Sequence, residues 1–238
     1  MSELCDVVIV AAKRTAVGAF QGSLASISAP QLGAIAIKAV LAETEIDPVL
    51  VDEVIMGNVL SAGQGQAPSR QAALGAGLPD SVECLTINKM CGSGLKAVML
   101  GTQAIQTGDA DIIIAGGMEN MTRAPYLLPK GRDGHRLGHG QIIDSMIKDG
   151  LWDAYNDKHM GNCAEMLADK NAFSREAQDA FAKTSYSHAQ SAQENGFFTD
   201  EIIPVSVPQR KGDPKIVDTD DEPGRANFDK MVALRPAF

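Results

Sequence analysis

The sequence predicts an α/β protein whose sheet is largely parallel and covered by helices. Short apolar runs alternate with helical patterns of about a dozen residues through the first half of the chain, and such units place neighbouring strands in parallel. With 45% hydrophobic and 21% charged residues, the 238 residues have the composition of a folded protein with a sizeable core.

The elements are expected in a regular order. The strands fall at 7–12, 53–60, 83–87 and 111–115, and the helices between them fall at 30–43, 67–77 and 92–107. Residues 7–12 form a continuous, mainly β-branched run, so we expect this strand to be buried on both faces of the sheet. Lys96 is the only charged residue of the helix at 92–107, so we expect this helix to be buried on nearly all sides.

The regular alternation ends after Glu119, and a second domain is expected at 120–238, following an α/β domain at 1–119. Residues 121–140 are rich in Pro, Gly and basic residues and are interpreted as an insertion. Residues 210–230 mix both charge signs with Gly and Pro and are interpreted as a solvated loop. Between them, helices are expected at 159–170 and 174–196, the second with Ser174 as its N-cap, and a strand-like segment is expected at 197–207.

The charge balance and the cysteines exclude several classes of protein. A formal net charge of -9 and a pI near 4.9 disfavour nucleic-acid binding, because the phosphates would be repelled. The chain shows no apolar run of membrane-spanning length and no signal-peptide pattern, so no membrane partner is expected. The cysteines are widely spaced without a CxxC pair, which indicates a reducing cytoplasm rather than a disulfide framework or a zinc site. They are Cys5, Cys84, Cys91 and Cys163.

Cys91 is the candidate nucleophile, within NKMCGSGLKA at 88–97. At the first turn of a helix it would face unpaired backbone N–H groups and the positive end of the helix dipole, which favour a thiolate. Neighbouring glycines let a ligand approach closely, and the N–H of Cys91 could donate to the oxyanion formed when its sulfur attacks a carbonyl. A packing cysteine in a tight turn is an equally open interpretation, because free cysteine is among the most buried residue types. The other three cysteines are interpreted as packing residues.

Several segments spread over the whole chain carry a family resemblance. They are RTAVGAF (14–20), GQGQAPSRQAAL (63–74), NKMCGSGLKA (88–97), GDADIIIAGGMENMT (108–122), MIKDGLWDA (146–154), HMGNCAE (159–165), SREAQDAFA (174–182) and the terminal LRPAF. Together and in this order they resemble the thiolase family, specifically its biosynthetic acetoacetyl-CoA type. The resemblance implies a layered thiolase-like fold in which 120–238 forms an inserted loop domain that binds coenzyme A.

The resemblance also implies a reaction. Cys91 would accept an acetyl group from acetyl-CoA as a thioester, and the carbanion of a second acetyl-CoA would attack it in a Claisen condensation that yields acetoacetyl-CoA and CoA. The reverse reaction is thiolysis. A covalent intermediate splits one difficult step into two easier ones. The coenzyme A thioester is the substrate, so no cofactor and no metal are expected.

For binding, the resemblance points to residues near the two ends of coenzyme A. Leu151 lies in KDGL, and His159 and Met160 lie in HMG, which are the segments that border the pantetheine tunnel in the family. Arg225 falls where the family carries an arginine for the nucleotide, in a segment that is shorter here. Other interpretations stay open, with His159 as a cap of the following helix and Leu151 and Met160 as core residues.

Two further groups of residues receive a role. Gly116 and Gly117 are expected to allow close backbone passage near the cysteine, with a plain tight turn as the alternative. Lys130, Arg132 and Arg136 lie in the segment that resembles the family's tetramerisation loop, which implies a homo-oligomer. A solvated basic loop is the alternative for these three residues.

The family's chemistry needs further groups that these residues do not supply. A base, a second cysteine and an asparagine come from Gly-His-Pro, Cys-Xaa-Gly and Asn-Glu-Ala-Phe segments in the C-terminal half of thiolases, and none of these occurs in the 238 residues. The last strand of the first sheet and the C-terminal repeat domain are also expected to be absent. We therefore expect the chain to be inactive alone, either as a fragment of a thiolase or as one chain of a split thiolase with a complementary C-terminal chain as partner. The alternative is a non-catalytic coenzyme A-binding or assembly module, and a ketoacyl synthase ranks lower because it lacks the HMG loop domain.

Overall fold

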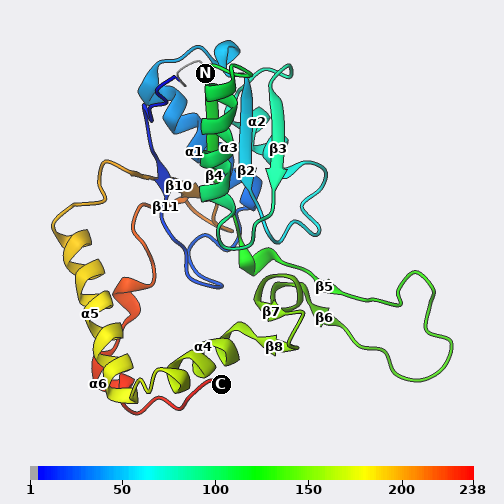
Figure 1. The fold of residues 1–238 in the computed structure, drawn as a ribbon, viewed down its shortest axis with the longest axis vertical. Helices are drawn as coiled ribbons and strands as arrows, with labels where there is room; N and C mark the ends of the chain where they lie inside the picture. The colour runs from blue at the N-terminus through cyan, green and yellow to red at the C-terminus, as the bar shows by residue number, and fades with distance from the viewer. Residues whose placement is uncertain (1–4) are drawn as a thin grey trace.

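The computed structural model describes residues 5–238, and its centre is a parallel three-stranded sheet with the strand order β3-β2-β4. Helices α1 and α2 pack on one face of this sheet and α3 packs on the other (Figure 1). The expectation of a parallel sheet covered by helices is therefore confirmed. The elements are α1 (Ala29–Thr44), β2 (Glu53–Gly57), α2 (Pro68–Ala76), β3 (Glu83–Ile87), α3 (Ser93–Thr107) and β4 (Ile113–Gly117).

Local signals in the sequence explain where these helices begin and end. Ser28 caps α1 in a capping box with Gln31, in which the Gln31 side chain accepts from the Ser28 N–H at 2.9 Å. Gly77 ends α2 and Gly108 ends α3, both in the left-handed conformation that glycine adopts without steric cost. These termini agree with the expected boundaries to within two residues.

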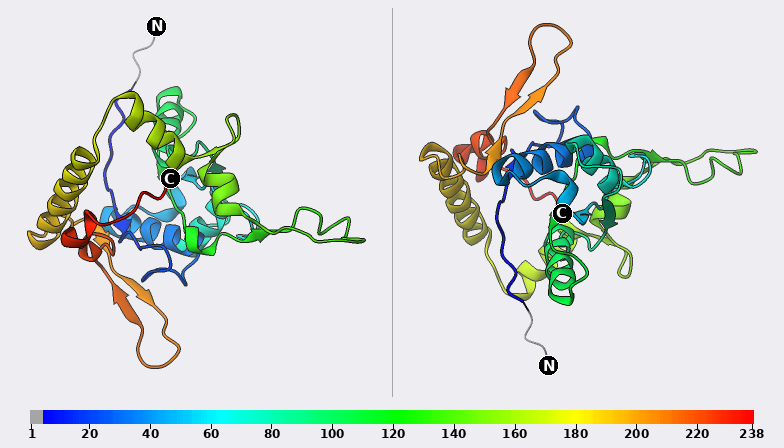
Figure 2. Two further views of the ribbon diagram at one scale, coloured as in Figure 1. Left: turned by 90° about the horizontal axis from the view of Figure 1, so that it is seen from below. Right: turned by 90° about the horizontal axis from the view of Figure 1, so that it is seen from above.

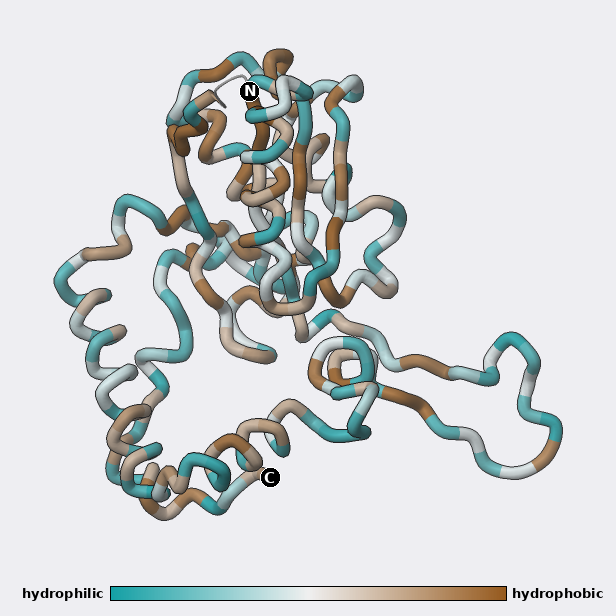
Figure 3. Tube along the Cα trace, in the orientation of Figure 1, coloured by the Kyte–Doolittle hydropathy of each residue, from teal (hydrophilic) through white to brown (hydrophobic). Residues whose placement is uncertain are grey.

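The main core lies between the sheet and the pair α1 and α2. The central strand β2 is buried on both faces, with Val54, Ile55 and Met56 at 0%, 2% and 3% exposure. Small residues of α2, Ala72 and Ala73, let that helix sit close to the sheet, and both are fully buried. The hydropathy colouring shows the apolar residues gathered in this layer (Figure 3).

The expected strand at 7–12 was wrong. Val8, Ile9 and Val10 are 74%, 76% and 67% exposed, and these residues form no strand. A cavity of about 310 Å³ separates residues 7–13 from β4, α1 and α3, so the backbone of this segment forms no ladder with β4. Pairing begins only at β1 (Arg14–Thr15), which lies parallel to β9 (Ile202–Ile203).

The expected burial of α3 on nearly all sides was also wrong. Ala97 and Gly101 face the sheet and are buried, but Leu95 and Met99 are 70% and 49% exposed. The helix contacts β2 and β4 on its inner side, and no segment among residues 5–238 covers its outer side. The helix has few charged residues because its outer face is apolar, and not because this chain buries that face.

The second half of the chain forms several small units around the sheet. The strands β5 and β6 pair at the base of a long arm (126–144), and β10 and β11 form a hairpin. Figure 2 shows this hairpin, in orange, and the green arm projecting in different directions. Among residues 5–238, no helix combines the length and the hydrophobicity that crossing a bilayer requires. The remaining elements are η1 (Pro48–Leu50), η2 (Met121–Arg123), β5 (Tyr126–Leu127), β6 (Ile143–Asp144), the π-helix η3 (Met146–Leu151), β7 (Trp152–Asp153), β8 (Lys158–His159), α4 (Met160–Lys170), α5 (Arg175–Glu194), β10 (Val205–Val207), β11 (Lys215–Val217), η4 (Pro223–Arg225) and α6 (Phe228–Met231).

The structure confirms both expected helices of this half and corrects the expected loop at 210–230. Ser174 caps α5 as predicted, since its side chain accepts from the Ala177 N–H at 3.2 Å. Within 210–230, however, Ile216 and Val217 belong to β11, and Val217 is buried against the partner strand. The charged residues that flank Ile216 and Val217 make this segment look like a loop in the sequence. In the structure, pairing with β10 gives these two residues apolar neighbours.

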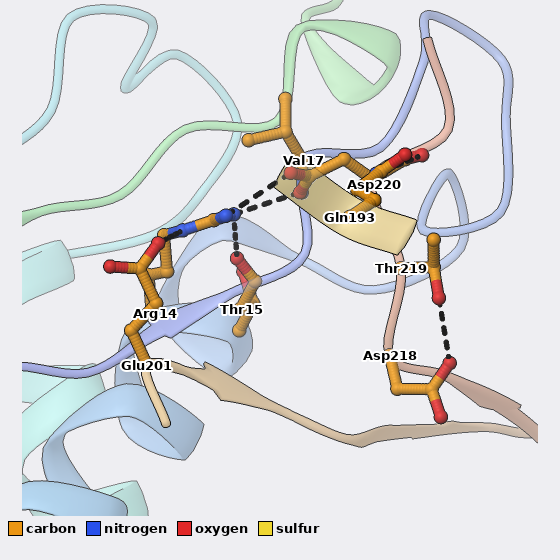
Figure 4. A network of polar contacts seen from close by, with 8 residues as sticks. All are labelled: Arg14, Thr15, Val17, Gln193, Glu201, Asp218, Thr219 and Asp220. Carbon is orange, nitrogen blue, oxygen red and sulfur yellow. Dashed lines mark hydrogen bonds and ion pairs between the residues drawn. The ribbon is translucent and has the colours of Figure 1, made fainter. Parts of the chain in front are cut away.

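A second core joins the two ends of the chain. Ala16, Leu24 and Ile27 pack with Val205 and Val217 in one buried cluster. Beside it, Arg14 bonds Asp220 through both carboxylate oxygens, at 2.8 and 3.1 Å, and bonds Glu201 at 2.6 Å (Figure 4). The division at 119/120 stays a prediction, but this cluster shows that Ala16, Leu24 and Ile27 are buried in part by β10 and β11.

The Arg14–Asp220 pair makes stability depend on pH. Burial opposes ionisation of Asp220, but bonds from the Arg14 guanidinium and the Val17 N–H outweigh it and hold the pKa of Asp220 below its ordinary value. A lowered pKa means that the carboxylate stabilises the fold above the unfolded value of about 3.9, and that this stabilisation is lost as the pH falls further. We expect Asp220→Asn to cost about 2 kcal/mol of unfolding free energy at neutral pH, with the difference from wild type shrinking below about pH 4.

Urea unfolding across this pH range measures the effect. Asp213→Asn, at an exposed position in the loop between β10 and β11, is the control and should leave stability unchanged. A deficit in Asp220→Asn that stays constant down to acid pH would show that the ion pair does not carry the stabilisation.

Candidate active site

Cys91 lies in the turn between β3 and α3, one residue before the N-cap Gly92. Its side chain is exposed, unlike those of Cys84 and Cys163, which are half-buried. The helix α3 begins at the carboxyl end of the parallel strands, which is the end of the sheet nearer to β7, β8 and α4 (Figure 1), and Cys91 directly precedes its N-cap. The predicted position at a helix start is thus confirmed, and the alternative of a buried packing cysteine is not supported.

The backbone around Cys91 leaves one donor unused. The N–H groups of Met90, Gly92 and Ser93 donate to Asn88 Oδ1, Lys89 O and Met90 O at 2.9, 3.2 and 3.0 Å. The N–H of Cys91 donates to no acceptor within residues 5–238. When Cys91 Sγ adds to a carbonyl carbon, the carbonyl oxygen becomes negatively charged. The free Cys91 N–H is available to donate a hydrogen bond to that oxygen.

Glycines bring the first turn of α3 directly against the sheet. A Cβ on Gly57 would lie 2.5 Å from Ser93 Cβ, and a Cβ on Gly117 would lie 3.4 Å from Gly94 Cα. The expected close backbone passage is confirmed for both glycines, because a Cβ on Gly94 would lie 3.6 Å from Gly116 C and from Gly117 N, while the side-chain position of Gly116 faces Met56. This contact fixes the height of the helix start above the sheet, and with it the position of the cysteine.

His159 is the N-cap of α4, so the capping interpretation is confirmed. Its Nδ1 accepts from the Gly161 N–H at 3.0 Å, and the Asn162 side chain completes a capping box by accepting from the His159 N–H at 3.3 Å. A neutral ring that accepts at Nδ1 carries its proton on Nε2. The cap thereby orients the ring and leaves an Nε2–H donor.

An aromatic cluster surrounds His159. The ring stacks on Phe238 at 4.7 Å between centroids and meets Trp152 edge-on at 6.5 Å. Phe238 also packs over Gly161, where a side chain would collide with its ring. Sequence reasoning missed this role of Phe238, and its place in the terminal LRPAF segment was the only signal available.

The other predicted binding residues are placed unevenly. Leu151 ends η3 directly before Trp152, and Met160 begins α4 directly after His159, so both adjoin residues of the His159 cluster along the chain. Met160 is 43% exposed, which contradicts the core interpretation for it. Arg225 instead ends η4, which packs against α5, and its side chain is mostly exposed and paired with Glu222 at 3.1 Å. The structure therefore does not join Arg225 to this cluster.

Neither the basic residues of the arm nor the residue types that ligate metals form a site in the described part of the chain. Lys130, Arg132 and Arg136 are all exposed in the loop at the end of the β5–β6 arm. Within residues 5–238, no group of His, Cys, Asp and Glu is arranged to hold a metal ion.

A parallel α/β sheet with an exposed cysteine at a helix start, and a free N–H beside its sulfur, has the arrangement that serves covalent acyl transfer. The model of the thiolase N-terminal domain matches residues 7–238, and the chain belongs to this family. It is 58% identical to an acetyl-CoA acetyltransferase of Pseudomonas aeruginosa over 234 residues, and 56% identical to one of Cupriavidus necator over 236 residues. An acetyl-CoA acetyltransferase 2 of Arabidopsis thaliana is 52% identical over 234 residues.

These alignments take in 98–99% of this chain but only 58–60% of the relatives. The chain thus spans about 60% of the length of the curated relatives that it matches. The resemblance of the sequence segments to thiolases is confirmed, and it concerns the N-terminal part of those proteins.

The glycine contact under α3 predicts a sharp sensitivity at Gly57. Gly57→Ala places a methyl group 2.5 Å from Ser93 Cβ and 2.8 Å from Gly94 N, so helix or sheet must move. We expect a loss of about 2 kcal/mol in unfolding free energy, measured by urea denaturation, because overpacking of this kind strains the backbone. Gly224→Ala is the control, since nothing lies within 4 Å of its added Cβ, and it should stay within about 0.5 kcal/mol of wild type. Equal stability of the two variants would contradict the contact.

The cysteines are expected to differ in reactivity. Burial raises the pKa of the Cys84 thiol, and the nearby Arg70 offsets this only in part, so less thiolate is present at neutral pH. With limiting iodoacetamide at neutral pH, we expect Cys91 to be alkylated about tenfold faster than Cys84. Peptide mapping by mass spectrometry gives both rates in one sample.

A Cys5→Ser background removes the other exposed thiol from this competition. Raising the pH should speed the alkylation of Cys84, because deprotonation limits it. Labelling of Cys84 ahead of Cys91 at neutral pH would refute this ranking.

Proposed function

We propose that this chain is the nucleophile-bearing part of a thiolase that joins two molecules of acetyl-CoA into acetoacetyl-CoA and CoA, and that also runs the reverse thiolysis. The observation that carries the proposal is the exposed Cys91 thiol with an unused N–H on the same residue. The names of the relatives, acetyl-CoA acetyltransferases, supply the acyl group and its carrier.

In the proposed first half-reaction, Cys91 Sγ attacks the carbonyl carbon of acetyl-CoA. The carbonyl oxygen becomes an oxyanion that accepts from the Cys91 N–H, and the intermediate collapses to an acetyl-cysteine thioester with loss of CoA thiolate. In the second half-reaction, the α-carbanion of another acetyl-CoA attacks the thioester carbonyl, which forms the new carbon–carbon bond and frees Cys91 Sγ. In the first step the sulfur of Cys91 replaces the sulfur of CoA on the acetyl group. One thioester is therefore converted into another of similar energy.

The His159 cluster is the proposed binding site for the pantetheine arm. The rings of Trp152 and Phe238 flank a histidine that offers an Nε2–H donor, and the apolar Leu151 and Met160 adjoin these residues in the sequence, a combination suited to a chain of methylene and amide groups. Arg225 is retained as a proposed contact for the nucleotide. Its exposed guanidinium would exchange Glu222 for a phosphate, at a distance from the cluster.

The catalytic cycle also needs a base and a proton donor that residues 1–238 do not provide, so we propose that this chain does not turn over alone. The exposed outer face of α3, with Leu95 and Met99, is consistent with a further part of the enzyme that covers it. The exposed arm with its basic loop is the proposed site of oligomer contacts.

Joining residues 1–238 to the remainder of the Pseudomonas aeruginosa relative tests the proposal. We expect this chimera to cleave acetoacetyl-CoA in the presence of CoA, and Cys91→Ser to lower kcat by at least about a thousandfold. Loss of absorbance of the acetoacetyl-CoA enolate measures the rate, and mass spectrometry of quenched enzyme detects the acetyl group on Cys91.

The unjoined chain serves as the control and should show no thiolysis. A chimera that folds but stays inactive would favour a non-catalytic coenzyme A-binding or assembly module instead. Turnover by residues 1–238 alone would refute the proposed need for a second part.

A further inference from the structure

The turn that presents Cys91 is closed by one side chain, and we infer that Ser93 is a positioning residue for the acyl-transfer chemistry of Cys91. Its hydroxyl accepts from the Lys89 N–H at 2.8 Å and donates to the Met90 carbonyl at 2.6 Å. Both bonds reach across Cys91, so the hydroxyl ties the residues before the cysteine to the first residue of α3. The inference rests on the proposed role of Cys91 as an acyl acceptor.

The turn needs this tie because Met90 has a left-handed backbone, with φ at 49°. A residue with a side chain resists this region, since its Cβ crowds the following carbonyl, and methionine has no local hydrogen bond to offset the cost. The Ser93 hydroxyl and the Asn88 side chain hold Met90 from both sides, at its carbonyl and at its N–H. Without the hydroxyl, the Met90 peptide is free to relax toward an ordinary conformation and to carry Cys91 with it.

The same bonds keep the Cys91 N–H unused. The Met90 carbonyl accepts from both the N–H and the hydroxyl of Ser93, and the Lys89 carbonyl accepts from the Gly92 N–H. The nearest carbonyls of the turn are thus engaged by other donors, so the turn is closed without the Cys91 N–H. The arrangement holds the donor and Sγ of one residue in a fixed relation, as stabilisation of an oxyanion requires.

Ser93 is itself held by the sheet. It is 5% exposed, and its Cβ lies where Gly57 leaves no room for any side chain. The sheet therefore fixes the position of Cys91 through a series of contacts: Gly57 contacts Ser93, and Ser93 bonds the Met90 carbonyl next to Cys91. A small error in the placement of Ser93 is passed to the cysteine, because no flexible side chain lies between them.

Ser69 provides a matched control within the chain. It is also a buried serine near the start of a helix, at 0% exposure, and its hydroxyl donates to the Val54 carbonyl at 3.0 Å. This bond fastens α2 to β2 and has no link to the turn at Cys91. Replacing each serine by alanine removes a similar buried hydroxyl, but only one of the two affects the cysteine.

Two reactions of Cys91 distinguish a loss of its positioning from a general loss of folded structure. Acylation by an aryl thioacetate passes through an oxyanion: Sγ adds to the carbonyl carbon, the arenethiolate leaves, and the thiol proton passes to water. Alkylation by iodoacetamide displaces iodide and forms no oxyanion. The ratio of the two rate constants, measured on residues 1–238 by peptide mass spectrometry, therefore reports the alignment of the Cys91 N–H with Sγ.

We expect Ser93→Ala to lower this ratio about tenfold, which corresponds to about 1.4 kcal/mol in the barrier. Ser69→Ala should leave the ratio unchanged even where it lowers the melting temperature equally. Adding Met90→Asn to Ser93→Ala should restore most of the ratio, because asparagine adopts the left-handed region more readily than methionine. If Ser93→Ala does not fold, Met90→Val probes the same turn and should lower the ratio too, since a β-branched residue resists a positive φ.

An unchanged ratio in Ser93→Ala, an equal fall in Ser69→Ala, or failure of Met90→Asn to restore it would each overturn the inference. The proposed function fails separately. In that case the ratio behaves as described with the aryl thioacetate, while the chimera with the remainder of the relative neither forms acetyl-Cys91 from acetyl-CoA nor cleaves acetoacetyl-CoA.

Discussion

The start of α3 rests directly on the ends of β2 and β4, because Gly57 and Gly117 present no side chains to it. Gly57 approaches Ser93 and Gly94 so closely that a Cβ would force them apart, and Gly117 lies against the Gly94 backbone. The helix start is therefore held at a fixed height above the sheet, and the turn before it must close in very little space. The left-handed Met90, the bridging Ser93 hydroxyl and the exposed Cys91 all follow from this contact.

Much of the first half of the fold could be predicted from the sequence, because each element there carries its own signals. The strand at 83–87 and the glycine at the end of α3 are examples, since hydrophobic pattern and C-cap both act locally. The segment at 7–12 has the same apolar pattern, yet its pairing depends on the edge of β4, from which a cavity separates it. For β11 the error was the opposite one: a loop was expected and a strand is present. Its few apolar residues pair with β10, although the charged residues beside them in the sequence indicate a loop.

The site divides in the same way between local and non-local causes. Cys91 could be singled out because glycines and a helix start lie beside it in the sequence. The left-handed Met90 could not, although the bonds that hold it come from Asn88 and Ser93 in the same turn, since methionine gives no sign of that conformation. For His159, the cap was one of two interpretations that the sequence left open, and the structure shows that the cap orients the ring. The stacking of Phe238 depends on a return of the chain that no local pattern encodes.

The ion pair between Arg14 and Asp220 also has a consequence for the order in which the protein assembles. Its partners are 206 residues apart, so at synthesis rates of about 5–20 residues per second Arg14 is added to the chain ~10 to 40 seconds before Asp220. During that interval the three-stranded sheet can form from neighbouring segments, while the arginine and the apolar residues after it have no partner. Arg14 and the apolar residues Ala16, Leu24 and Ile27 therefore lack their late contacts with Asp220, Val205 and Val217 until those residues have been synthesised.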